Sequence, residues 1–163
     1  MSDLQNIIKN KFGHRLRTRV SGICIEDEKI LMVRHAGLGK TGTFWAPPGG
    51  GMNFGMNAKE NLIREVKEET DLDVTVGQFM FVHEYLEKPL HAIELFFRIK
   101  IKDGEIKRGF DPELSSNNQI IKEVKFMSFK EIVDLGGAHI HNIFNVCKSI
   151  SEIEFLNGYL IFQ

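Results

Sequence analysis

Residues 45–72 read WAPPGGGMNFGMNAKENLIREVKEETDL, and two different patterns meet in this stretch. Its first part is so rich in glycine and proline that we expect an irregular loop. From about Ala58 to Thr70 the pattern becomes helical: Leu62 and Val66 are four residues apart on one apolar face, and Asn57 is placed to cap the start. The sequence therefore predicts a loop that leads directly into a helix.

A second stripe on the same predicted helix is acidic. Glu65, Glu68 and Glu69 have the spacing i, i+3 and i+4, so their carboxylates share one helical face and repel one another unless a cation binds. Hard oxygen ligands of this kind suit Mg²⁺ or Mn²⁺. An ordinary solvated helix face is the alternative, and the helix alone would favour it. The preceding glycine turn favours the metal site, because exposed backbone amides and carbonyls beside carboxylates suit a metal-bound phosphate.

Length and composition limit the classes of protein that remain. A chain of 163 residues with 42% apolar content is sufficient for one packed domain. The formal net charge of -1 offers no overall positive field, so we expect neither nucleic acid nor a membrane as a partner. Cys24 and Cys147 are too few for a disulfide framework, and we find no apolar run that resembles an export signal. We therefore expect a cytoplasmic location.

The remaining pattern alternates between strands and helices, which is typical of an α/β fold. The glycine-rich residues 36–43 do not form a phosphate-binding P-loop, because Arg34 stands where that motif needs a glycine. We predict a helix at residues 4–8 and strands at residues 17–25, 29–35, 78–83, 92–101 and 122–127. We also predict a polar connection at residues 84–91, a polar loop at 110–119, a capped helix from Ser128, a core-facing helix at 140–147 and a hairpin at Asn157–Gly158.

The residues from Gly50 to Leu72 resemble the signature of the Nudix hydrolases, Gx5Ex7REUxEExGU, in which U is aliphatic. The matching residues are Gly50, Arg64, Glu65, Val66, Glu68, Glu69 and Leu72. The resemblance implies a Nudix-type α/β/α sandwich with a central mixed β-sheet. It also implies a single domain over residues 1–163, in which 1–14 are an N-terminal extension and 45–72 carry the glycine turn and the signature helix.

The signature departs from the family pattern at two main positions. Asp71 replaces the final glycine, and an aspartate tolerates the left-handed conformation of a helix C-cap at modest cost. Met56 replaces the first glutamate, and a thioether neither accepts a proton at neutral pH nor coordinates magnesium. Glu60 is one turn further along and is a conceivable substitute, but its spacing to Arg64 favours a surface ion pair instead. Asn53 also replaces a glutamate that many members carry.

The resemblance assigns roles to the matching residues. Glu65, Glu68 and Glu69 are the expected ligands of Mg²⁺, or of Mn²⁺, together with a backbone carbonyl that we assign to Gly49. Arg64 is expected to orient Glu65. Two acidic residues outside the signature, Glu113 and Glu123, are candidates to approach the metals, although each could be a solvated side chain. The general base therefore stays open among Glu65, Glu113, Glu123 and the metals themselves.

The activity that the resemblance implies is divalent-metal-dependent hydrolysis of a pyrophosphate bond. The bond belongs to a nucleoside diphosphate linked to another moiety, in a nucleoside triphosphate or an ADP-sugar, and a homodimer is left open. Met56 and Asn53 motivate an alternative in which a weakened domain binds or senses a nucleotide metabolite. Isomerisation of an isoprenoid diphosphate is a third and weaker hypothesis. The histidines are scattered along the sequence, and we expect none of them to bind zinc: His14, His35, His83, His91, His139 and His141.

Overall fold

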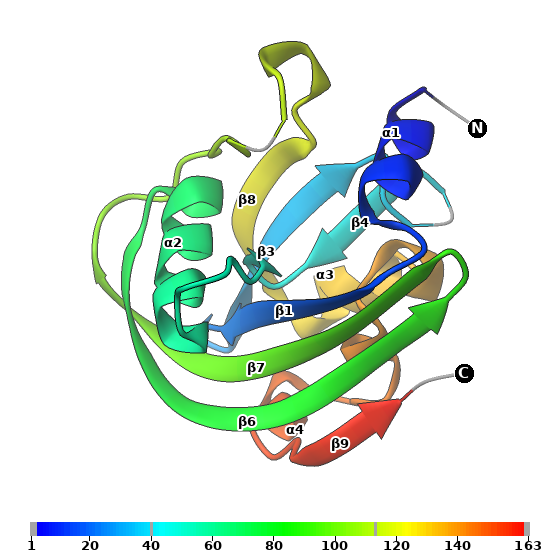
Figure 1. Cartoon of the computed structure of the whole chain (residues 1–163). Helices are drawn as coiled ribbons and strands as arrows, with labels where there is room; N and C mark the ends of the chain where they lie inside the picture. The colour runs from blue at the N-terminus through cyan, green and yellow to red at the C-terminus, as the bar shows by residue number, and fades with distance from the viewer. Residues whose placement is uncertain (1–2, 40, 113, 162–163) are drawn as a thin grey trace.

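The strands form two sheets, of which the first is a mixed sheet of five strands (Figure 1). The computed structural model describes residues 3–39, 41–112 and 114–161. The strand order is β5-β1-β7-β6-β9, with β1 at Leu16–Ile23, β5 at Gly49–Gly51, β6 at Asp73–Glu87, β7 at Leu90–Asp103 and β9 at Gly158–Ile161. Strand β1 runs parallel to β7 and antiparallel to β5, and β6 runs antiparallel to β7.

The second sheet is antiparallel and is centred on β3, which spans Lys29–Ala36. Strands β2 (Ile25–Glu26) and β4 (Thr43–Ala46) pair with its two ends, and β8 (Ile121–Ser128) pairs along most of its length. The predicted strands at residues 29–35 and 122–127 are therefore confirmed.

The predicted signature helix is α2, which spans Ala58–Thr70. The side chain of Asn57 accepts the backbone N–H of Glu60, and the Glu60 carboxylate accepts the backbone N–H of Asn57, which completes a capping box. At the other end Asp71 adopts the left-handed conformation with φ 61°, and its N–H donates to the carbonyl of Lys67. Both caps agree with the sequence prediction, and together they fix where the acidic helix begins and ends.

Helices lie on two sides of the strands because residues of β3 alternate between two cores. Leu31 faces the core that α2 completes with Leu62 and Val66. Ile30 and Met32 face the other core, which includes Ile132 of α3 (Phe129–Asp134) and Ile153 of α4 (Ile150–Ile153). The α/β class with a mixed central sheet is thus confirmed. A second sheet, which contains β3, contributes to both cores.

The N-terminal helix α1 spans Asp3–Phe12, in agreement with the helix predicted at residues 4–8. The longest helix in the described ranges is α2, with 13 residues. None of the helices there has the length and apolar character needed to cross a membrane. Cys24 and Cys147 are buried and unpaired, and burial raises the pKa of each thiol to about 11, so both act as small apolar side chains in the core.

Two predicted loops contain more strand than expected. The loop prediction for residues 45–55 was wrong in part, because Ala46 ends β4 and Gly49–Gly51 forms β5. These positions are glycine because β1 and α2 approach β5 so closely that Cβ atoms at Gly49 and Gly50 would clash with them. The polar connection predicted at residues 84–91 was also wrong, because β6 continues to Glu87 and only Lys88 and Pro89 separate it from β7. Pairing with β7 outweighs the polarity of these residues.

The C-terminal predictions were right about burial and wrong about structure. Ile140, Phe144 and Cys147 are all buried in the core, but residues Asn142–Asn145 form a 3-10 helix rather than an α-helix. Asn157 and Gly158 do not turn a hairpin, because β9 pairs in parallel with β6. A local turn signal cannot reveal a partner strand more than 70 residues away in the sequence.

Replacing Asn57 with alanine is expected to destabilise the fold by about 1 kcal/mol, because the first turn of α2 loses its side-chain cap. Urea unfolding measures this change. Lys59→Ala is the matched control on the exposed side of the same turn, and it should stay within ~0.5 kcal/mol of the wild type. Equal stability of the two variants would contradict the capping role.

Candidate active site

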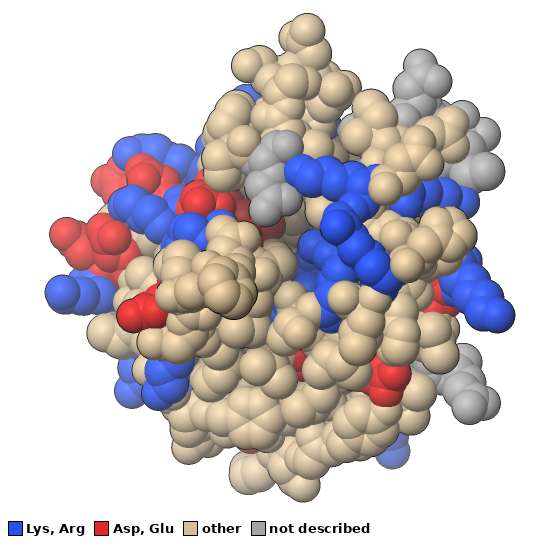
Figure 2. Space-filling view, in the orientation of Figure 1, with Lys and Arg blue, Asp and Glu red and all other residues tan. Residues whose placement is uncertain are grey.

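A cavity of about 990 Å³ opens between α2, the first sheet and residues 137–146. Its walls differ in character. Carboxylates of α2 form one side, basic residues of β1 form another, and apolar side chains such as Phe12, Phe44 and Leu90 lie around the rest. Figure 2 shows Lys and Arg side chains gathered beside a hollow near β1 and α1. The cavity can therefore hold a ligand with both charged and apolar parts.

The three predicted metal ligands, Glu65, Glu68 and Glu69, all line this cavity. Arg64 lies among them: its Nη2 donates to Glu65 Oε1 (2.8 Å) and its Nη1 donates to Glu68 Oε2 (2.9 Å). Nη2 also donates to the carbonyl of Gly51 at 3.1 Å, which ties the helix to β5. The predicted pairing of Arg64 with Glu65 is present, and one guanidinium group positions two carboxylates.

Glu69 is the most buried of the three carboxylates, with 8% of its side chain exposed. Its Oε1 lies 3.0 Å from His35 Nε2, and its Oε2 accepts the backbone N–H of Gly49 at 2.8 Å. The carbonyl of Gly49 accepts a long hydrogen bond from Arg19 at 3.4 Å. Glu69 and the backbone of Gly49 are therefore held together on the cavity wall. The contact of His35 with Glu69 was not predicted from the sequence.

Gly50 has no side chain because the Glu65 carboxylate occupies that space. A Cβ atom at Gly50 would lie 2.3 Å from Glu65 Cδ and Oε2. Real contacts of this kind are essentially never so short, so Glu65 could not keep its position beside any larger residue. The first glycine of the signature is thus required by a specific carboxylate.

The charge of this wall fits a hard divalent cation. Burial and the neighbouring charge of Glu69 together raise the pKa of Glu65 to about 7, against the opposing effects of Arg64 and Arg19. Two carboxylates and a nearby backbone carbonyl form an all-oxygen donor set, which suits Mg²⁺ or Mn²⁺. Such a cation would offset the repulsion that the two carboxylates now bear.

The loop at residues 107–110 closes the C-terminal end of α2. Backbone N–H groups of Lys107, Gly109 and Phe110 donate to the last carbonyls of the helix, at 3.0, 2.9 and 2.9 Å. This attachment brings Phe110 and Asp111 to the cavity. Glu113, the candidate base predicted in the same loop, lies outside the described residues and stays a prediction.

Glu123, the other predicted base, does not line the cavity. Its Oε2 lies 3.2 Å from Arg34 Nε, and its Oε1 lies 3.6 Å from Lys125 Nζ. Arg34 and His35 are neighbours on β3, so their side chains point to opposite faces of the sheet, and Glu123 accompanies Arg34. The structure brings Glu123 to a surface ion-pair cluster, and its catalytic role stays a prediction.

Asn61 organises the turn in which the signature departs from the family pattern. This fully buried side chain accepts the N–H of Asn53 at 2.8 Å and donates to the carbonyls of Met56 and Asn57 at 3.0 and 2.9 Å. Met56 does not line the cavity. The predicted ion pair between Glu60 and Arg64 was wrong, because Glu60 caps α2 and Arg64 points to the cavity carboxylates. Sequence reasoning missed Asn61 because its position on the helix carries no motif.

Arg17 and Arg19 supply the basic wall of the cavity. They are two residues apart on β1, so both side chains lie on the same face of the sheet. The guanidinium group of Arg17 stacks over the ring of Phe12, 4.0 Å from its centroid. The Arg19 Nε lies 3.4 Å from Glu94 Oε1. A ligand in this cavity would therefore meet both carboxylates and guanidinium groups.

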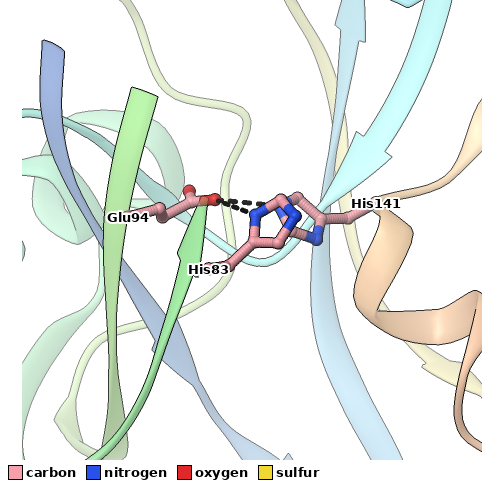
Figure 3. A group of neighbouring side chains, drawn as sticks. All are labelled: His83, Glu94 and His141. Carbon is pink, nitrogen blue, oxygen red and sulfur yellow. Dashed lines mark hydrogen bonds and ion pairs between the residues drawn. The ribbon is translucent and has the colours of Figure 1, made fainter. Parts of the chain in front are cut away.

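A second polar cluster lies deeper in the cavity wall and consists of His83 on β6, Glu94 on β7 and His141 just before the 3-10 helix (Figure 3). All three are buried, with exposed fractions of 1%, 5% and 7%. Glu94 Oε2 lies 2.8 Å from His141 Nε2 and 3.6 Å from His83 Nδ1. The fold thus brings together His83 and His141, which are far apart in the sequence. The cross-strand pairing of His83 with Glu94 explains part of this cluster, but it cannot be read from the sequence.

Neighbouring polar groups stabilise the buried carboxylate of Glu94 in its ionised form. Burial alone would raise the pKa of Glu94, but His141, His83 and Arg19 together hold it well below its usual value. Ser21 Oγ also donates to Glu94 Oε1 at 2.6 Å. Burial lowers the pKa of His141, so the imidazole is neutral beside an ionised carboxylate.

Comparison with known proteins agrees with this geometry. The family model described as the NUDIX domain matches residues 15–144 of the chain. The chain therefore belongs to the Nudix hydrolase family. The matched region excludes helix α1 and the residues after 144, which include α4 and β9.

Individual relatives are distant. An ADP-ribose pyrophosphatase of Methanocaldococcus jannaschii is 30% identical over 122 residues, which are 74% of this chain and 66% of that protein. A Bacillus subtilis protein is 28% identical over 97 residues, which are 56% of this chain and 45% of that protein. The matches thus span less than two thirds of either relative's length.

Solved structures show the same fold. A NUDIX hydrolase of Nitrosomonas europaea superposes with a TM-score of 0.71 at 16% identity, over 88% of this chain and 93% of that one. An ADP-ribose pyrophosphatase of Streptococcus suis 89-1591 superposes with a TM-score of 0.59 at 18% identity, over 90% of this chain and 98% of that one.

Replacing Gly50 with alanine is expected to displace the Glu65 carboxylate and abolish stabilisation by Mg²⁺ or Mn²⁺. The unfolding temperature of the metal-free protein should fall less than that of the metal-bound protein, because the clash involves the end of the Glu65 side chain, which can swing away. Gly51→Ala is the matched control, since its Cβ would meet only the end of Arg17 at 3.2 Å. Thermal unfolding with and without the cation measures both variants. Equal metal-induced stabilisation of Gly50→Ala and the wild type would contradict the packing argument.

Proposed function

We propose that this chain is a divalent-metal-dependent pyrophosphohydrolase that acts on a nucleoside diphosphate linked to another moiety. The observation that carries the proposal is the wall formed by Glu65, Glu69 and the backbone of Gly49, which lines one cavity together with Arg17 and Arg19. The proposal rests on the family and on this charge arrangement together, because a fold alone does not determine chemistry.

In this proposal Glu65, Glu68 and Glu69 hold Mg²⁺ or Mn²⁺, with the Gly49 carbonyl as a backbone ligand. The bound cation would neutralise charge on the diphosphate and lower the pKa of an attacking water. Arg64 keeps Glu65 and Glu68 in position, and His35 with the Gly49 N–H keeps Glu69 in position. These contacts preorganise the carboxylates, so little reorganisation is needed when the substrate binds.

Arg17 and Arg19, which line the same cavity as the carboxylates, are proposed to bind the phosphate oxygens. Guanidinium groups suit this role because their donors match the geometry of phosphate. The aromatic and aliphatic side chains farther along the cavity, including Phe12, Phe44 and Leu90, would accept the less charged parts of the ligand.

The proton acceptor is proposed to come from the acidic residues near the metals. Met56 removes the residue that the signature places first, so Glu65 and the predicted candidates Glu113 and Glu123 share the assignment. Glu65 contacts the cavity directly, which favours it over Glu123 on the surface ion-pair cluster.

We favour an ADP-sugar over a nucleoside triphosphate as the substrate. The cavity, at about 990 Å³, is at the large end of the range for ligand sites, roughly 300–1,000 Å³. It can therefore accommodate a group on each side of the diphosphate. Two of the relatives, from Methanocaldococcus jannaschii and Streptococcus suis, are named ADP-ribose pyrophosphatases.

Replacing Glu69 with glutamine is expected to lower Mg²⁺-dependent hydrolysis at least roughly 100-fold, because the carboxylate loses its charge while its contacts are nearly preserved. Glu68→Gln combined with Glu69→Gln should abolish turnover. Glu60→Gln is the matched control, since it makes the same chemical change on the exposed side of α2 and keeps the capping box. Phosphate release is the readout, and unchanged turnover in the Glu69 variant would exclude the metal assignment.

A panel of ADP-ribose, nucleoside triphosphates and dinucleoside polyphosphates separates the substrate classes. We expect the highest kcat/KM with ADP-ribose and no turnover when a chelator removes the divalent cation. Faster hydrolysis of nucleoside triphosphates would overturn the ADP-sugar assignment. Saturable ADP-ribose binding with no turnover on any substrate would favour the alternative that Met56 and Asn53 motivate, a domain that senses a nucleotide metabolite.

A further inference from the structure

We propose that His83, Glu94 and His141 form a second metal site, selective for a transition-series divalent ion such as Zn²⁺ and separate from the carboxylates of α2. One ligand atom from each residue lies within 4.8 Å of the others. Figure 3 shows the Glu94 carboxylate and both imidazoles pointing toward one another from different segments of the chain. Imidazole nitrogen suits zinc, copper, iron and nickel, whereas the all-oxygen wall of α2 suits magnesium.

The distances are close to those that one ion requires. Ligand atoms of a tetrahedral zinc ion at ~2.1 Å are roughly 3.4 Å apart. Glu94 Oε2 lies 2.8 Å from His141 Nε2 and 3.6 Å from His83 Nδ1, so shifts of less than about 1 Å would centre an ion between them. The three residues lie on β6, β7 and the segment before the 3-10 helix, and this framework is formed without the ion.

The surroundings orient the carboxylate as a ligand. Ser21 Oγ and Arg19 Nε both donate to Glu94 Oε1, at 2.6 and 3.4 Å, which leaves Oε2 directed at the imidazoles. Outer contacts of this kind fix ligand geometry in metal sites. All three ligands also line the cavity, so a bound ion would keep an open position toward the ligand space. Three protein ligands with one open position are typical of catalytic rather than structural zinc sites.

A proton occupies the central position when no metal is bound. The N–H of Ile143 donates to His141 Nδ1 at 3.3 Å, so the imidazole carries its proton on Nε2 and donates it to Glu94. A zinc ion at Nε2 would require this proton to move to Nδ1, which keeps the imidazole neutral, and the long bond from Ile143 to Nδ1 would be lost. A hydrogen-bonded network without metal is therefore the competing account.

Zinc titration in the absence of substrate tests the site directly. The full chain is stripped with a chelator, saturated with excess Mg²⁺ to occupy the α2 carboxylates, and titrated with Zn²⁺ by calorimetry. We expect one Zn²⁺ per chain and a rise in the unfolding temperature. His83→Gln and His141→Gln should each weaken zinc binding at least ~10-fold. His91→Gln is the matched control, because His91 pairs with Glu84 at 2.7 Å outside this cluster.

Co²⁺ in place of Zn²⁺ keeps the test decisive if a variant fails to fold, because nitrogen-ligated Co²⁺ absorbs visible light in the wild-type protein. Three results would overturn the proposal: no zinc bound by the wild type in excess Mg²⁺, unchanged affinity in both folded histidine variants, or loss of the zinc in Glu68→Gln. Since no substrate is present, these results are independent of whether the chain hydrolyses a pyrophosphate.

Discussion

The contact between the Glu65 carboxylate and the bare backbone of Gly50 is the constraint on which the site depends. Glycine in β5 allows α2 to approach the sheet so closely that a carboxylate packs against the strand, and Arg64 joins the same helix to the carbonyl of Gly51. The Gly49 N–H then binds Glu69 from the other side. Two carboxylates of one helix are thus fixed against one strand, where burial and the repulsion from Glu69 raise the pKa of Glu65.

Other parts of the fold maintain this contact. The capping box at Asn57 sets where α2 begins, and Asn61 ties the preceding turn to the helix. The loop at residues 107–110 binds the carbonyls at the other end of α2. Strand β1 holds β5 in register and carries Arg19 to the cavity beside the Gly49 carbonyl, so one strand positions both the glycines and a basic residue. The acidic and basic walls are therefore parts of one rigid arrangement.

Local patterns in the sequence were sufficient to predict α2, its caps and the acidic stripe, because a helix brings together residues that are three and four apart. The family resemblance then identified which face of the helix carries the chemistry. The same reasoning failed where contacts join distant residues. His35 meets Glu69 across 34 positions, and His141 meets Glu94 across 47, so no local pattern could reveal either pair. Glycines 49–51 were mistaken for an irregular loop because a strand without side chains lacks the alternation by which strands are recognised.

The substitution at Met56 separates binding from proton transfer. The thioether is outside the cavity lining, whereas the carboxylates that we assign to the metal remain on it, so the departure from the signature leaves the proposed metal ligands untouched. The most direct test of this account is anomalous diffraction from crystals soaked with Mn²⁺. The account predicts a peak bound by Glu65 and Glu69 beside the Gly49 carbonyl. A crystal in which Mn²⁺ at saturating concentration leaves these two carboxylates without an ion would contradict it.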